Sequence, residues 1–161
     1  MHPRARQLID DLCLQPHPEG GYFREIHRSS ARVHPGDERP DRAAVTSIYF
    51  LLVGGQHSRW HRVRSDELWH FYEGDALDLL LAPPAITQVD VLVVSPSTGP
   101  GQSIQVAPAD WWQAARSRGA YSLVGCTVAP GFEYADFAFL RDDPDRVALL
   151  AALGPEYVAL A

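Results

Sequence analysis

The sequence predicts an all-β fold, a sandwich or barrel of about nine short strands with a short helix at each end. Segments rich in β-branched and aromatic residues recur along most of the chain, and glycine and proline clusters separate them. Helical spacing of apolar residues occurs only at the two ends. These observations favour packed sheets over a helical bundle.

The chain is expected to begin and end in short helices. Pro3–Leu14 carries an apolar stripe at helical spacing, and Pro16 follows it as a stop signal. Near the other end, Asp143 is expected to cap a helix that begins at Pro144 and ends at Gly154.

The segments between the helices are expected to form strands joined by turns. The polar segment Ser30–Arg42 is rich in proline, arginine and aspartate, and we expect a loop there. The expected strands are Tyr22–His27, Ala44–Val53, His61–Val63, Glu67–Phe71, Ala76–Ala82, Thr87–Ser95, Ser103–Val106, Ala120–Val128 and Ala135–Leu140.

The segment His57–Gly74 concentrates most of the potential functional groups. His61 lies on one expected strand, and Glu67, Trp69 and Phe71 form a row on one face of the next. Since only a short turn separates the two strands, His61 and Glu67 are expected to point into one cavity that the two aromatic rings wall.

Four other polar residues lie in or near expected turns. His17 and Glu19 precede Gly20 and Gly21, where solvated turn residues are favoured over site residues. Glu133 and Asp136 are expected near the mouth of the barrel, where solvation and ligand contact are both open alternatives.

Length and composition limit the classes of function. The 161 residues suit a single domain over residues 1–161. A formal charge of −6 argues against a nucleic-acid binder, and the fourteen basic residues are all arginine, which excludes lysine chemistry. No apolar run approaches the about 18 residues of a membrane span. Cys13 and Cys126 are expected to be buried free thiols, and we predict a cytoplasmic protein that does not bind membranes.

Two stretches resemble the motifs of the cupin superfamily. Gly55, His61, Glu67 and Gly74 stand at the spacing of the glycine, first histidine, glutamate and final glycine of the first motif, and Val63 replaces its second histidine. The resemblance implies a double-stranded β-helix, the cupin jelly-roll barrel.

The second cupin motif has a partial counterpart in Pro108–Gln113. Asp110 stands where that motif has a glycine, and Gln113 stands where it has a histidine. These departures leave the fold resemblance intact but remove a usual metal ligand.

The chain looks more specifically like the cupin-5-like branch of uncharacterised proteins. Across roughly residues 8–140, this resemblance implies a cupin barrel and a homodimer. The stretches that carry it are His17–Phe23, Thr46–Tyr49, His61–Val63, Ser65–Glu67, Trp69–Tyr72 with Gly74, and Ala129–Phe132.

Two kinds of chemistry are open for the expected cavity. Metal-binding cupins commonly use three histidines and a glutamate, so the resemblance implies His61, Glu67 and Gln113 as candidate ligands for iron, manganese, nickel or zinc. The neutral amide of Gln113 is a weak ligand, which counts against a metal site. Without a metal, His61 and Glu67 form a base and acid pair, because a carboxyl group buried among aromatic rings has a raised pKa.

The predicted ligand is a small polar, sugar-like molecule, with Trp69, Phe71, Trp111 and Gln113 as its binding residues. Three functions remain open: an isomerase or epimerase, a non-catalytic binding or sensing protein, and a metal-dependent, oxygenase-like enzyme. The residues favour a ligand-binding cupin with isomerase-type acid–base activity.

Overall fold

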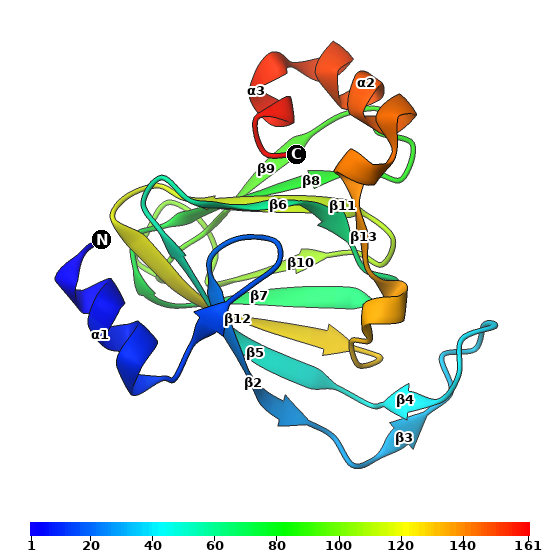
Figure 1. The fold of residues 1–161 in the computed structure, drawn as a ribbon, viewed down its shortest axis with the longest axis horizontal. Coiled ribbons are helices and arrows are strands. Elements are labelled where there is room, and N and C mark those ends of the chain that lie inside the picture. The colour runs from blue at the N-terminus through cyan, green and yellow to red at the C-terminus, as the bar shows by residue number, and fades with distance from the viewer.

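Two antiparallel sheets face each other in the computed structural model, which describes residues 1–161 (Figure 1). The six-stranded sheet has the order β1 (Gln15–Pro16), β2 (Tyr22–Arg28), β5 (Thr46–Val53), β12 (Tyr121–Ala129), β7 (Asp66–Gly74) and β10 (Ile104–Ala107). The five-stranded sheet has the order β13 (Ala138–Phe139), β6 (His57–Arg62), β11 (Trp112–Ser117), β8 (Leu77–Ala82) and β9 (Asp90–Val94). The two packed sheets confirm the predicted all-β jelly roll.

Apolar side chains fill the space between the sheets, and β8 illustrates how the core is built. Every residue of β8 is buried. Leu77, Leu79 and Leu81 face the core between the sheets, whereas Leu80 belongs to a second cluster on the other side of the same sheet. Because both faces of β8 are covered, its sequence is almost continuously apolar.

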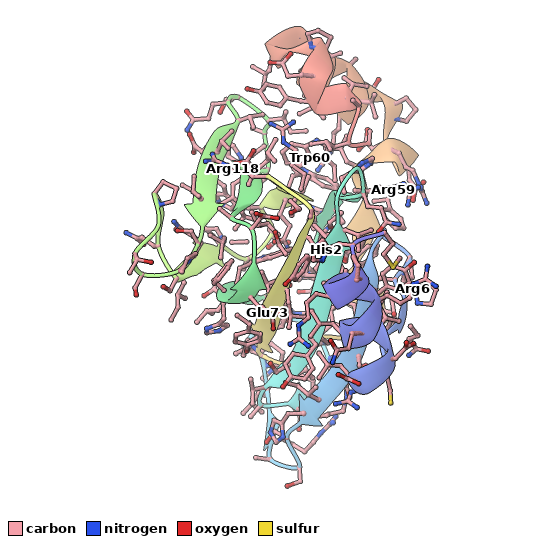
Figure 2. The ribbon with its side chains drawn as sticks, turned by 90° about the vertical axis from the view of Figure 1, so that its left-hand side faces the viewer. His2, Arg6, Arg59, Trp60, Glu73 and Arg118 are labelled. Atoms are coloured by element: carbon pink, nitrogen blue, oxygen red, sulfur yellow. The ribbon has the colours of Figure 1, made fainter.

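The C-terminal helices α2 (Pro144–Leu153) and α3 (Pro155–Val158) cover the outer face of the five-stranded sheet (Figure 1). Asp143 caps α2 by accepting a hydrogen bond from the backbone N–H of Arg146 at 3.2 Å, as predicted. The indole of Trp60 lies beneath the helices and donates to the backbone oxygen of Tyr157 at 2.9 Å (Figure 2). No helix in the chain has the length and apolar character needed to cross a membrane.

Helix α1 (Pro3–Asp11) lies on the outer face of the six-stranded sheet. Ala5 and Leu8 are its buried residues and pack on that face. Arg4 makes two hydrogen bonds, of 2.7 and 2.8 Å, to the carboxylate of Glu73, which lies on the sheet beside the helix (Figure 2). The helix is therefore held by both apolar contact and an ion pair.

Some element boundaries differ from the predictions. Helix α1 stops before the predicted Leu14, where Cys13 adopts a φ of 51°. Cys13 is exposed rather than buried as predicted, whereas Cys126 is buried. The predicted loop Ser30–Arg42 contains a short ribbon formed by β3 (Arg32–Val33) and β4 (Arg42–Ala43), which projects from the sandwich (Figure 1).

The predicted strand Ala135–Leu140 is wrong over most of its length. It forms the 3₁₀ turns η1 (Tyr134–Asp136) and η2 (Leu140–Asp142), and only β13 between them pairs with β6. Asp136 turns inward to an ion pair with the buried guanidinium of Arg42, so the backbone does not stay extended. Asp136 is therefore a structural residue rather than a solvated residue of the rim.

Candidate functional site

A cavity of about 100 Å³ lies against the inner face of the six-stranded sheet. Strands β2, β5, β7 and β12 contribute side chains to its wall, and so do the loops that precede β2 and follow β12. Pockets for drug-sized ligands measure about 300 Å³ or more. The cavity therefore suits a small molecule or one end of a larger one.

Strand β7 places Glu67 in the cavity wall. Glu67 and Trp69 are buried, whereas Leu68 and His70 are only half-buried on the opposite face of the sheet. This alternation is the one that the sequence predicted. Glu67 therefore faces the cavity because alternate side chains of β7 point to the inner face of the sheet.

Glu67 is held by a short chain of hydrogen bonds. The Nε2 of Gln113 donates to Glu67 Oε2 at 2.5 Å, and the indole Nε1 of Trp69 donates to Gln113 Oε1 at 3.0 Å. Since an indole N–H can only donate, it fixes the orientation of the Gln113 amide and directs the amide hydrogens toward Glu67. Gln113 thus positions the carboxyl group.

A β-bulge in β6 brings Ser58 and His61 to the same face. His61 pairs with Gln113 of β11, whereas Ser58 pairs with Ala115, so β6 has one extra residue in this interval. The extra residue turns Ser58 and His61 toward the inside together and leaves Trp60 on the outside, beneath the C-terminal helices. Both polar side chains consequently reach Glu19.

Glu19 lines the cavity and is a second buried carboxyl group. It is 8% exposed, and the Ser58 hydroxyl donates to its Oε2 at 2.6 Å. Its Oε1 lies 3.4 Å from His61 Nε2 and 3.6 Å from His17 Nδ1. The prediction that His17 and Glu19 are solvated turn residues is wrong, because both side chains are buried and line the cavity.

The two glycines after Glu19 allow this turn to pack closely. Gly20 has a φ of 115°, and a Cβ at this position would lie 2.3 Å from the backbone oxygen of His57. A Cβ at Gly21 would lie 2.6 Å from the backbone oxygen of Leu51. The Gly-Gly pair was thus the sequence signal for a closely packed turn after Glu19, because only glycine fits both conditions.

The two ring nitrogens of His61 face different groups. Its Nδ1 donates to the backbone oxygen of Arg59 at 2.7 Å, which leaves Nε2 facing Glu19. The ring of Phe137 stacks on the imidazole with a centroid distance of 5.3 Å. His61 is 2% exposed and does not itself line the cavity.

Burial shifts the pKa values of five groups at the site, those of Glu19, Glu67, His17, His61 and Cys126, in the direction that favours the neutral form. It raises the pKa values of Glu19 and Glu67, and the charge of Glu19 raises the pKa of Glu67 further. It lowers the pKa values of His17 and His61. Burial also raises the pKa of the Cys126 thiol, which contacts Glu67 and is therefore an unreactive thiol.

The three aromatic residues predicted to bind the ligand do not line the cavity. Trp69 belongs to the core between the sheets, and Phe71 and Trp111 pack against that core. Side chains on the inner faces of the strands either fill the core or line the cavity, and these three rings belong to or pack against the core. The aromatic residues that line the cavity are Phe23, Phe132 and Tyr134.

The mouth of the cavity carries an arginine held by two glutamates. Arg28 donates to Glu25 at 3.1 and 2.9 Å and to Glu133 at 2.9 Å. All three side chains line the cavity and are partly exposed to solvent. Glu133 therefore lies in the cavity wall with its side chain partly in solvent, and solvation and ligand contact both stay open for it.

The predicted metal ligands are arranged for other partners. The Gln113 oxygen accepts a hydrogen bond from Trp69, and the Gln113 nitrogen donates to Glu67. The amide oxygen is therefore already engaged and is not directed at a metal ion. His61 Nε2 faces Glu19. No three histidine, cysteine, aspartate or glutamate side chains are grouped so that they could hold a metal ion. His61, Glu67 and Gln113 therefore do not fit the transition-metal site of a typical cupin.

Asp110 explains one departure from the second cupin motif. It occupies the position of the motif glycine and adopts a φ of 64°. Aspartate tolerates the left-handed region better than most residues, so the turn before β11 keeps its conformation without glycine.

The fold and family of the chain follow from its relatives. A hypothetical protein from Leishmania major is 31% identical, with a TM-score of 0.81 over 97% of this chain and 95% of its own. A protein from Shewanella oneidensis is 30% identical, with a TM-score of 0.80 over 97% of this chain and 93% of its own. An uncharacterised Klebsiella pneumoniae protein with a double-stranded β-helix domain, 14% identical, has a TM-score of 0.53 over 80% of this chain and 86% of its own. That last likeness concerns the fold alone.

No curated protein matches this sequence. A family model described as Cupin superfamily (DUF985) matches residues 6–140, which is most of the chain and includes every residue of the cavity wall. The predicted resemblance to the cupin-5-like branch is thereby confirmed, and the chain belongs to the Cupin_5 family of the cupin superfamily.

Proposed function

We propose that this cupin binds a small polar molecule in its cavity and that Glu67 exchanges a proton with it. The observation that carries the proposal is the position of Glu67, which is 7% exposed and yet lines the cavity. A buried carboxyl group with a raised pKa is suited to general acid–base catalysis near neutral pH. The proposed reaction class is isomerisation or epimerisation beside a carbonyl group.

In this proposal, Glu67 takes a proton from the carbon beside the carbonyl group and an enolate forms. In isomerisation, protonated Glu67 returns the proton to the former carbonyl carbon while the neighbouring hydroxyl proton moves to the former carbonyl oxygen. In epimerisation, water protonates the opposite face of the same carbon and Glu67 gives its proton to solvent.

Gln113 holds one oxygen of Glu67, so the other oxygen is available to the substrate. His61 is the second member of the pair and acts through Glu19, since its Nε2 faces that carboxyl group. A proton shared by Glu19 and His61 adjusts the local charge when Glu67 changes its protonation state.

Hydrogen exchange with solvent tests this proposal without knowledge of the natural substrate. Small ketoses and aldoses are incubated with the protein in D₂O, and NMR follows deuterium incorporation at the carbon beside the carbonyl group. A Glu67→Gln variant should lose about 100-fold or more of the exchange rate. Glu156→Gln, which removes an exposed carboxylate on α3, should keep the rate of the parent.

Two outcomes of the exchange experiment would contradict the proposal. Either no sugar exchanges in the presence of the parent protein, or the exchange persists at full rate in Glu67→Gln.

A non-catalytic binding or sensing protein is the second candidate. It is favoured by the internal contacts of His61, whose Nδ1 donates to the backbone and whose ring stacks on Phe137 instead of lining the cavity. In that case Glu67→Gln changes the affinity for a ligand, and the parent protein incorporates no deuterium.

The predicted homodimer remains a proposal. Strand β1 pairs with β2 only at Tyr22 and Phe23, so the outer edge of β2 from Arg24 to Arg28 has no strand beside it. An open edge of this kind is suited to pairing with another strand or to coverage by a second subunit. Light scattering should give about twice the 17.8 kDa of the chain, and a monomeric mass would exclude the dimer.

A further inference from the structure

The hydrogen-bond donors around the two buried carboxyl groups are already used within the protein. Gln113 donates to Glu67, and Ser58 donates to Glu19. Apart from Gln113, the only group that donates to Glu67 is the Cys126 thiol, which is a weak donor. A carboxylate can accept about four hydrogen bonds, so Glu67 keeps unused acceptor capacity while it is nine-tenths buried and lines the cavity.

The single arginine at the cavity is also engaged. Three hydrogen bonds from the Arg28 guanidinium go to the carboxylates of Glu25 and Glu133. Four glutamates and one arginine line the cavity, so carboxyl groups outnumber guanidinium groups there. A ligand carboxylate or phosphate would meet acceptors at Glu67 and Glu19 and no free cation.

The remaining wall of the cavity is apolar. Phe23, Ile48, Val63 and Phe132 lie among the lining residues. Such a wall suits the carbon body of a ligand and, at the aromatic faces, a positive charge.

From these contacts we infer that the ligand is a small organic ammonium compound, such as an amino sugar or amino polyol. Its ammonium group donates to Glu67 and Glu19, and its carbon body lies against the apolar wall. This inference rests on the proposed binding of a small polar molecule and adds the charge of that molecule. Ammonium hydrogen bonds to a carboxylate are charge-assisted and stronger than those of a neutral hydroxyl group.

Matched ligands test the inference directly. Glucamine, glucitol and gluconate share a polyol chain and end in an ammonium, a hydroxyl and a carboxylate group, respectively. Calorimetry should show that glucamine binds about tenfold or more tightly than glucitol, and that gluconate binds more weakly than glucitol. Benzylamine, benzyl alcohol and benzoate repeat the comparison on an apolar body.

Three variants locate the preference for the amine. Glu67→Gln should reduce the advantage of glucamine over glucitol about tenfold. Glu133→Gln removes one of the two carboxylate partners of Arg28 at an exposed position. It should therefore lower the affinity for glucamine and raise the affinity for gluconate. Glu156→Gln makes the same change in net charge on an exposed residue outside the cavity and should leave all three affinities unchanged. Thermal unfolding without ligand checks that each variant is folded.

The outcomes separate the inference from the proposed function. If glucitol binds as tightly as glucamine and loses affinity in Glu67→Gln, the ammonium inference is overturned and the binding function stands. If the amine preference survives in both Glu67→Gln and Glu133→Gln, the amines bind elsewhere and the inference is overturned. If none of the ligands binds, the inference is overturned as well, and the deuterium-exchange experiment decides the proposed function independently.

Discussion

The Oε1 of Glu19 lies 3.4 Å from the Nε2 of His61, although one residue belongs to a turn before β2 and the other to β6. The bulge in β6 and the close approach of the Gly20 turn to His57 make this contact. The two ring nitrogens of His61 thus have different roles: Nδ1 is fixed by the backbone, and Nε2 faces a carboxyl group that lines the cavity.

The first prediction concerns the turn that carries Glu19. Gly20→Ala should destabilise the protein more than Gly36→Ala does. Both glycines have a positive φ, so each substitution should lower the free energy of unfolding by about 1–2 kcal/mol through backbone strain. Only the Cβ at position 20 meets a backbone oxygen, at 2.3 Å, whereas nothing lies within 4 Å of a Cβ at position 36. Equal free energies of unfolding for the two variants would show that the turn does not pack against β6 in this way.

The second prediction concerns the pH dependence of stability. Burial raises the pKa of Glu67 above its ordinary value of 4.5, so the folded state binds more protons than the unfolded state above that pH. Stability contributed by this group therefore falls as pH rises from about 4.5 through the raised pKa. Glu67→Gln removes the fall, and the variant should gain stability relative to the parent as pH increases through this window. Urea unfolding at a series of pH values measures the difference.

Asp37→Asn provides a control with the opposite sign. Hydrogen bonds from Arg39 lower the pKa of Asp37 to about 2, so its contribution is present above its ordinary value of 3.8 and is lost as pH falls toward about 2. The variant should be less stable than the parent at neutral pH and should converge with it in acid. A Glu67→Gln difference that does not change with pH would contradict a raised pKa of Glu67.

The third prediction concerns the two buried arginines that pair with Asp136. Asp136 accepts hydrogen bonds from both Arg42 and Arg39. The distance from the Arg39 nitrogen to Asp136 Oδ2 is 3.2 Å, and Arg42 is only 2% exposed. Asp136→Asn leaves buried positive charge without its partner and should destabilise the protein by about 3–5 kcal/mol. Glu38→Gln removes the exposed partner of Arg64 and should have little effect on the urea midpoint. A small effect of Asp136→Asn would show that water already reaches the two guanidinium groups.

Periodicity explains why much of the fold was predictable from the sequence. In β7, alternate residues face the core, so the burial of Glu67 and Trp69 follows from period two. The same periodicity does not say where along the inner face the side chains stop filling the core. Trp69 was therefore assigned to the cavity, but it lies in the core.

The contacts of Glu19 and Asp136 could not be derived from local pattern. Glu19 is buried because a bulge in β6, whose position has no sequence signature, brings Ser58 toward it. Asp136 is buried because Arg39 and Arg42 reach it from a polar segment that reads as a solvated loop. Both contacts join segments far apart in the sequence, and both bury charged residues that are exposed in most proteins.

The most direct test of a buried acid–base residue in the cavity is the titration of the carboxyl groups by ¹³C NMR, with Glu67→Gln and Glu19→Gln used to assign the signals. Both carboxyl groups are expected to titrate above the ordinary value of 4.5, and removal of Glu19 should move the titration of Glu67 to lower pH. Ordinary titration of Glu67, unaffected by Glu19→Gln, would contradict a buried acid–base residue in this cavity.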